Sequence, residues 1–237
     1  MDDPKQYSNK SFRSQFSQPL ETFTMTAMDN PVAFAGASEL NQHGAALLAS
    51  GDYRGAYCTF QTARRKLRSS SSSSTSFAKS QYSSLMARTL PRLEDDNFYM
   101  FNQALLFHAD GSPSIQMCDC ILNFNLALSC HGQALVTPRD QLFSRALTLY
   151  RATFESLSQL PDDYSNSEYA LVLTMGALNN LSHIHFEFGE VSYAARLLQT
   201  IQPLTYSLSH NSTKIFNVQG YQLNTNACNC IVTARCA

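Results

Sequence analysis

The stretch ELNQHGAALLASGDYRGAYCTFQTARRKL, residues 39–67, predicts two antiparallel helices joined by a tight turn. Gly51 can adopt the left-handed conformation that ends the first helix, and Asp52 can cap the second. In the second helix, small and large apolar residues recur at helical spacing and define one buried face: Ala56, Phe60, Ala63 and Leu67. The stretch therefore predicts a helical hairpin at residues 37–68.

Two later stretches repeat this layout, with a small residue in a first helix and an alanine followed by a large apolar residue in a second. In the earlier one, Thr137 is the predicted cap of the second helix. The later one opens at Ser165 and Glu168, which form a capping-box pattern. Together they place a second and a third hairpin within residues 97–204. The chain is therefore predicted to be all-α, an irregular array of antiparallel helical hairpins.

The first hairpin resembles one tetratricopeptide repeat (TPR), although Leu40 stands where the family most often has Trp. Over residues 39–204 the chain also resembles a group of uncharacterised TPR-like proteins from diatoms. The small residues of successive hairpins lie farther apart than the family's interval of about 34 residues, which predicts an irregular array. The resemblance implies a helical scaffold and no established activity. It rests on these repeat positions: Gly44, Gly51, Tyr53, Ala56, Phe60, Ala63, Ala127, Ala146, Tyr150, Ser182, Gly189, Ala194 and Leu198.

Four segments lie outside the predicted hairpins or interrupt them. Residues 1–36 have no sustained periodicity and are predicted to be disordered, as is the Ser-rich insert at residues 69–96. The aromatic-rich stretch 97–109 could form a strand that pairs with residues 214–223 in a small β-ribbon. A helix in either stretch is the alternative. Residues 205–237 form a C-terminal extension.

The composition excludes several classes of partner. Charged residues make up 15% of the chain, against roughly 25% in ordinary soluble domains. The 17 Lys+Arg and 18 Asp+Glu give a net charge of -1, so no overall field attracts nucleic acid or an anionic membrane. The chain shows no signal-peptide pattern and no sufficiently apolar span. We expect an intracellular protein, in the cytoplasm or alternatively the nucleus, with a protein or peptide partner.

The first helices of such an array line its concave face, where a partner peptide would bind. This face is neutral to apolar and has no Lys or Arg, which disfavours recognition of a terminal carboxylate. The function predicted is a non-enzymatic scaffold or adaptor that binds a peptide or helix there. In the alternative, the protein's own insert or C-terminal tail covers this face. The candidate partner-binding residues are Asn41, Leu48, Phe124, Leu128, His131, Asn179, His183, Phe186 and Glu187.

No catalytic, cofactor or metal site is predicted. Cys118 and Cys120, together with Cys228 and Cys230, could form a four-thiolate zinc site. Their separation by a single residue points the paired thiols to different sides, which favours free, partly buried thiols. A thiol or zinc protein is the weaker alternative.

Three further polar features have mainly structural interpretations. Asn125 and Asn180 occupy equivalent positions in two hairpins, and buried amides of this kind are expected to bond a neighbouring main chain. His185 is expected to be a hydrogen-bonded core histidine.

A basic cluster ends the second helix, where cations favour the helix C-terminus: Arg64, Arg65, Lys66 and Arg68. In a second interpretation, the serines that follow this cluster are phosphorylated, and the protein acts through its insert.

Overall fold

The computed structural model describes residues 31–69, 86–88, 99–107, 114–137, 139–160, 167–208 and 218–236. The protein is all-α, as predicted, and its described residues include two short strands. The described part contains α1 (Pro31–Ala49), α2 (Tyr53–Ser69), β1 (Met86–Arg88), β2 (Ala104–Leu106), α3 (Ile115–Val136), α4 (Asp140–Ser158), α6 (Glu168–Glu187), α7 (Val191–Thr205) and α9 (Val218–Cys236).

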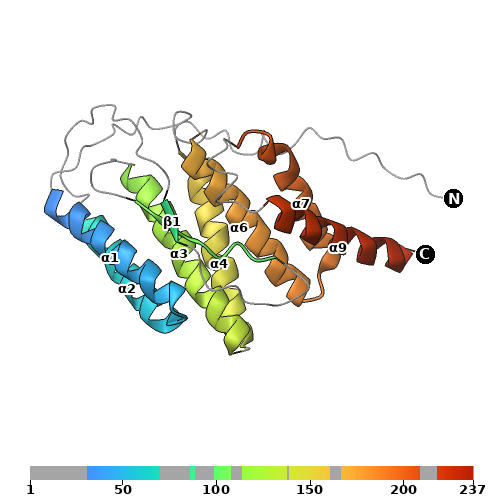
Figure 1. Ribbon diagram of the computed structural model, residues 1–237, viewed down its shortest axis with the longest axis horizontal. Helices are drawn as coiled ribbons and strands as arrows, with labels where there is room; N and C mark the ends of the chain where they lie inside the picture. Colours follow the sequence, from blue (N-terminus) through green and yellow to red (C-terminus); the bar gives the residue numbers. More distant parts are fainter. Residues whose placement is uncertain are drawn as a thin grey trace.

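The helices form an array in which each helix packs against the next in the chain. Helices α1 and α2, α3 and α4, and α6 and α7 form three hairpins, and each second helix also contacts the following first helix. Helix α9 packs on α7 at the end of the array (Figure 1). Helices α1, α3, α6 and α9 therefore alternate with α2, α4 and α7.

The first hairpin forms for the reasons that its sequence predicts. Gly51 has a φ of 82°, a left-handed conformation that favours glycine. The main-chain N–H of Gly55 donates to Asp52 Oδ1 at 2.8 Å, so Asp52 caps α2. A Cβ on Gly44 would lie 2.6 Å from Phe60 Cε1, so only glycine allows this approach of α1 and α2. The predicted stripe Ala56, Phe60, Ala63 and Leu67 is buried.

The later hairpins repeat this packing. Gly189, with a φ of 76°, makes the turn between α6 and α7. Tyr53 is half-buried, and its ring packs over Gly132 of α3. The remaining repeat positions are buried: Ala127, Ala146, Tyr150, Ser182, Ala194 and Leu198.

Three helix starts differ from prediction. Helix α1 begins at Pro31, within the segment predicted to be disordered, because Phe34 and Ala33 extend its buried face toward the N-terminus. Helix α4 is preceded by Arg139, whereas Thr137 ends α3 by donating its N–H to Gln133 O. The cap of α6 is Ser167, whose hydroxyl accepts from Ala170 N. Ser165 lies outside the described residues.

The predicted β-ribbon has the wrong partner. Residues 104–106 do form a strand, but it pairs antiparallel with β1, with Leu105 opposite Ala87. Residues 218–223 lie in α9 and so belong to a helix, and 214–217 lie outside the described residues. Strand β1 also falls inside the insert 69–96 that was predicted to be disordered.

Candidate functional site

Residues 99–107, which we call the groove segment, lie extended across the face formed by α1, α3, α6 and α9. We call this face the first-helix face. Tyr99 contacts α6 and α9, Phe101 contacts α6, Leu105 contacts α3 and α1, and Phe107 contacts α1. The groove segment therefore runs opposite to the order of the helices (Figure 1).

Asparagine side chains clamp the main chain of the groove segment. An asparagine amide presents an acceptor oxygen beside a donor NH₂ group, so it can bind both the N–H and the C=O of one extended residue. Three asparagines on successive first helices do so. The N–H and C=O distances are 3.0 and 2.8 Å for Asn125 with Leu105, 2.8 and 2.8 Å for Asn180 with Phe101, and 2.6 and 2.7 Å for Asn224 with Tyr99.

Further polar groups support these clamps. Asn41 Nδ2 donates to Leu105 O at 3.1 Å, and Asn41 Oδ1 accepts from Asn125 Nδ2 at 2.9 Å. Asn179 Nδ2 donates to Tyr99 O at 3.0 Å. Ser38 Oγ donates to the carbonyl of residue 107 at 2.7 Å. The polar groups of the first-helix face thus bind the main chain of the groove segment.

The clamped residues, 99, 101 and 105, all have odd numbers. In an extended chain the N–H and C=O groups of successive residues point to opposite sides, so odd-numbered residues present theirs to the same side. Leu105 accordingly turns its main-chain groups to Asn125 of α3, whereas the residues beside it turn theirs to β1. Strand pairing and amide clamping together hold this part of the groove segment.

Aromatic rings anchor the side chains of the groove segment. Phe101 and Phe107 are fully buried. The Phe101 ring lies 5.7 Å from that of Phe124, and the Phe107 ring lies 5.6 Å from that of Phe34, between ring centroids. Such ring pairs stabilise the contact beyond the area that they bury.

The candidate partner-binding residues do not form an open surface, which corrects the prediction. Those buried are Asn41, Leu48, Phe124, Leu128, His131, Asn179 and His183, whereas Phe186 is half-buried and Glu187 is exposed. Asn41, Phe124 and Asn179 are covered because the groove segment binds to them. Leu48 and Leu128 belong to the core between the helices. The protein does cover this face itself, but with residues 99–107, which belong neither to the insert 69–96 nor to the C-terminal extension 205–237 that the alternative named.

His131 and His183 instead form a buried polar cluster with Tyr150, and the exposed Glu187 contacts this cluster through His183. His131 Nδ1 lies 3.4 Å from Tyr150 Oη, and the two histidine rings lie 5.0 Å apart. His183 Nε2 contacts Glu187 Oε1 at 3.4 Å. Burial, and to a lesser degree the charge of His183, lowers the pKa of His131 well below its usual value, so its imidazole is neutral. The cluster joins α3, α4 and α6.

Asn125 and Asn180 do bond main-chain groups, as predicted, and His185 is a hydrogen-bonded core histidine. His185 Nδ1 lies 2.5 Å from Glu190 Oε2. Asn180 Nδ2 also donates to Tyr150 Oη at 2.9 Å, which connects the clamp on Phe101 to the histidine cluster.

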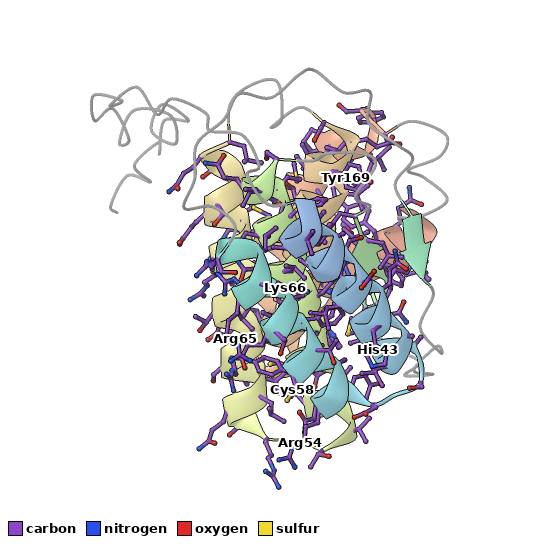
Figure 2. The ribbon with its side chains drawn as sticks, turned by 90° about the vertical axis from the view of Figure 1, so that its left-hand side faces the viewer. His43, Arg54, Cys58, Arg65, Lys66 and Tyr169 are labelled. Carbon is purple, nitrogen blue, oxygen red and sulfur yellow. The ribbon has the colours of Figure 1, made fainter. Side chains whose placement is uncertain are left out.

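The basic cluster of α2 is partly neutralised by α3. Arg64 Nε and Arg68 Nη2 contact the two oxygens of Asp119 at 2.8 and 2.9 Å. Burial would raise the pKa of Asp119, but hydrogen bonds from both arginines hold this pKa below its ordinary value. Arg65 and Cys58 face outward along α2 (Figure 2). The serines at 70–84 lie outside the described residues.

The cysteine pairs do not form the four-thiolate arrangement. Cys118 and Cys120 lie on α3, and Cys228 and Cys230 lie on α9, which packs on α7. Burial raises the pKa of Cys120 to about 12 and that of Cys228 to about 11, so both remain thiols near neutral pH. In the part of the chain that the structure describes, no three His, Cys, Asp or Glu residues are arranged to hold a metal ion.

Sequence reasoning missed three contributors to the site: Asn224, Gly176 and Gly220. Asn224 was missed because it follows the predicted strand 214–223 within the C-terminal extension, for which no helix was predicted, although Leu-Asn at 223–224 resembles the Asn-Leu pairs at 125–126 and 180–181 in composition. The glycines carry no pattern that marks them. They matter because aromatic rings of the groove segment pack directly on them.

Comparisons with known proteins do not show which family this chain belongs to. Among the described residues, no helix is both long and apolar enough to cross a membrane. No protein-family model, curated protein or solved structure matches this chain.

Proposed function

We propose that this protein is a non-enzymatic, TPR-like scaffold that binds an extended peptide along its first-helix face. One observation carries the proposal: three asparagines on successive first helices each bind the N–H and C=O of a single residue in an extended chain. Clamps of this kind recognise main chain, which every peptide has. The occupant in the structure is the protein's own groove segment.

The chemistry of the face supports binding without catalysis. The side chains described above as holding the groove segment are amides, a hydroxyl and aromatic rings, which neither gain nor lose a proton near neutral pH. The clamps lie on rigid helices, so they are ordered before a peptide binds. This preorganisation reduces the conformational entropy that binding costs.

Selection from a random peptide library displayed on phage, with the full chain as bait, tests the proposal. We expect enriched peptides whose binding is lost in Asn180→Ala, because that change removes one clamp. The matched control is Asn123→Ala. Asn123 is a buried asparagine of α3 whose side-chain oxygen has no hydrogen-bond partner among the described residues. Enrichment of no peptide, or equal loss in both variants, would contradict the proposal.

A second candidate is favoured by the burial of the groove segment. In this candidate the segment seals the face permanently, and the protein acts through its Ser-rich insert. Amide hydrogen exchange separates the two functions. A permanently sealed face requires the amides of Tyr99, Phe101 and Leu105 to exchange only with global unfolding. A peptide-binding face requires the groove segment to leave at a lower free energy than global unfolding.

A further inference from the structure

The clamps explain how a main chain is held, but they do not select a sequence. Selectivity must come from the side chains of the bound segment and from the space that the helices leave for them. Two glycines provide that space. A Cβ on Gly176 of α6 would lie 3.1 Å from Phe101 Cδ1 and 3.2 Å from Phe124 Cζ.

Gly220 of α9 provides a second space of the same kind. A Cβ there would lie 2.5 Å from Tyr99 Cγ, closer than real Cβ contacts come. Cγ joins the ring to the main chain, so it cannot move aside without the whole side chain. We call these two sites, at Gly176 with Phe124 and at Gly220, the aromatic sockets.

From the sockets we infer the chemistry of the partner: an uncharged, extended peptide with aromatic residues at two alternate positions, equivalent to Tyr99 and Phe101. The inference rests on the proposed function. Residues 104–107 are all buried, so the rest of the bound segment is expected to be apolar. Asn102 and Gln103, which lie between Phe101 and the buried residues 104–107, are only half-buried and select less.

A charged residue at the Phe101 socket would be rejected. The Phe101 site is lined by Phe124 and by the main chain at Gly176, with the neutral amide of Asn180 beside it. A charge buried there would lose its hydration without gaining an ion pair. An aromatic ring instead buries a large apolar surface and packs edge-on against Phe124, as Phe101 does at an interplanar angle of 64°.

The groove segment competes with any such partner. A segment tethered to its own site acts at an effective concentration of about millimolar. A partner can bind the wild-type chain only while the groove segment has left the face. Its apparent affinity is therefore the intrinsic affinity multiplied by the fraction of time that the face is free. Weakening the segment's own anchor should consequently strengthen binding of a peptide added in solution.

A fluorescein-labelled peptide, YMFNQALLF, which copies residues 99–107, is the probe. Fluorescence anisotropy measures its binding to the full chain carrying Phe101→Ala, whose fold is checked by circular dichroism. We expect at least tenfold tighter binding than to the wild-type chain. Replacing the probe's first Phe with Ala should weaken binding at least tenfold, whereas replacing its Asn with Ala should have little effect.

A socket variant provides the reciprocal test. Gly176→Leu in the Phe101→Ala chain fills the socket, so it should weaken binding of the YMFNQALLF probe at least tenfold. Binding of the probe that carries Ala in place of its first Phe should not change. If Phe101→Ala fails to fold, hydrogen exchange of the wild-type chain replaces it. Excess probe should then accelerate exchange of the Phe101 and Leu105 amides, and the Ala-substituted probe should not.

The outcomes separate the two hypotheses. Equal binding of the aromatic and Ala-substituted probes would overturn the aromatic sockets and leave the proposed function standing. No binding to a folded Phe101→Ala chain, with unchanged exchange in the wild type, would overturn both. A concentration-dependent dimer of the full chain that excess probe does not dissociate would assign the sockets to a second copy, which also overturns the inference.

Discussion

Asn180 connects two structural units through one neutral side chain. Its amide binds the N–H and C=O of Phe101 and also donates to Tyr150 Oη of α4. The N–H and C=O of Phe101 are buried, so neither can turn to water when the amide is removed, whereas Tyr150 Oη keeps its contact with His131. The free energy at stake is therefore the cost of leaving those groups unpaired rather than the small net gain of a hydrogen bond.

Replacing Asn180 with Ala should lower the free energy of unfolding by roughly 1–3 kcal/mol for each buried main-chain group that is left unpaired. Urea denaturation at neutral pH measures the loss. Asn123→Ala is the control, because the side-chain oxygen of Asn123 has no hydrogen-bond partner in the described part of the chain. If the two variants lose equal stability, the clamp on Phe101 contributes nothing specific.

The asparagines show how far the sequence can predict the site. Asn125 and Asn180 were identifiable because they recur at equivalent positions, and a buried amide must find a partner. The partner of each amide could not be identified from the sequence, because an amide can bond any main chain, whether of a helix or of an extended segment. The pairing joins Asn180 to Phe101, which is 79 residues away, and no local pattern encodes it.

Helices α3, α4 and α6 meet at the histidine cluster, whose stability depends on pH. His131 of α3 is fully buried, faces Tyr150 of α4 and lies beside His183 of α6, which contacts Glu187. Burial holds its pKa in the folded protein well below the ordinary value of 6.5. The unfolded chain therefore binds a proton at higher pH than the folded chain does.

His131 places no penalty on folding above pH 6.5, and it destabilises the fold progressively as the pH falls from 6.5 toward its folded-state pKa. We expect the thermal midpoint to fall more between pH 7 and pH 5 in the wild type than in His131→Gln, which cannot take up the proton. Differential scanning calorimetry at both pH values measures this. Equal falls in the two proteins would remove His131 as the cause.

Hairpins were predictable where local chemistry is unambiguous. Gly51 and Asp52 perform the turn and cap roles that their positions predict, because glycine and aspartate suit few alternatives there. Thr137 was assigned to the wrong helix, since a residue between two helices can end one or begin the other. The partner of strand β2 was wrong because strand pairing is set by contacts distant in sequence.

The groove segment makes the array more than a chain of neighbouring contacts. In a stack of helical hairpins, each unit contacts mainly the next, so stability is close to a sum of local terms and the ends can unfold separately. Residues 99–107 bridge from Asn224 of α9 to Ser38 of α1. Bonds that span the whole array should couple its two ends and make unfolding cooperative.

Two tryptophan probes test this coupling, because the chain contains no Trp of its own. Tyr57→Trp reports on α2 and Tyr193→Trp reports on α7. With the groove segment intact, both probes should give the same urea midpoint, as a two-state transition requires. When Phe101→Ala and Leu105→Ala are added, the midpoints should separate and the dependence on urea should become shallower, because each end then exposes less surface as it unfolds.

The control for that experiment is Leu198→Ala, which removes a buried side chain of α7 and leaves the groove segment untouched. Such a truncation costs about 2–5 kcal/mol, so it should lower both midpoints together. A common midpoint in the doubly substituted segment variant would mean that the contacts between consecutive helices suffice for cooperativity. A separation of the midpoints means that the ends are coupled through the groove segment, so a partner that displaces it would also loosen the array.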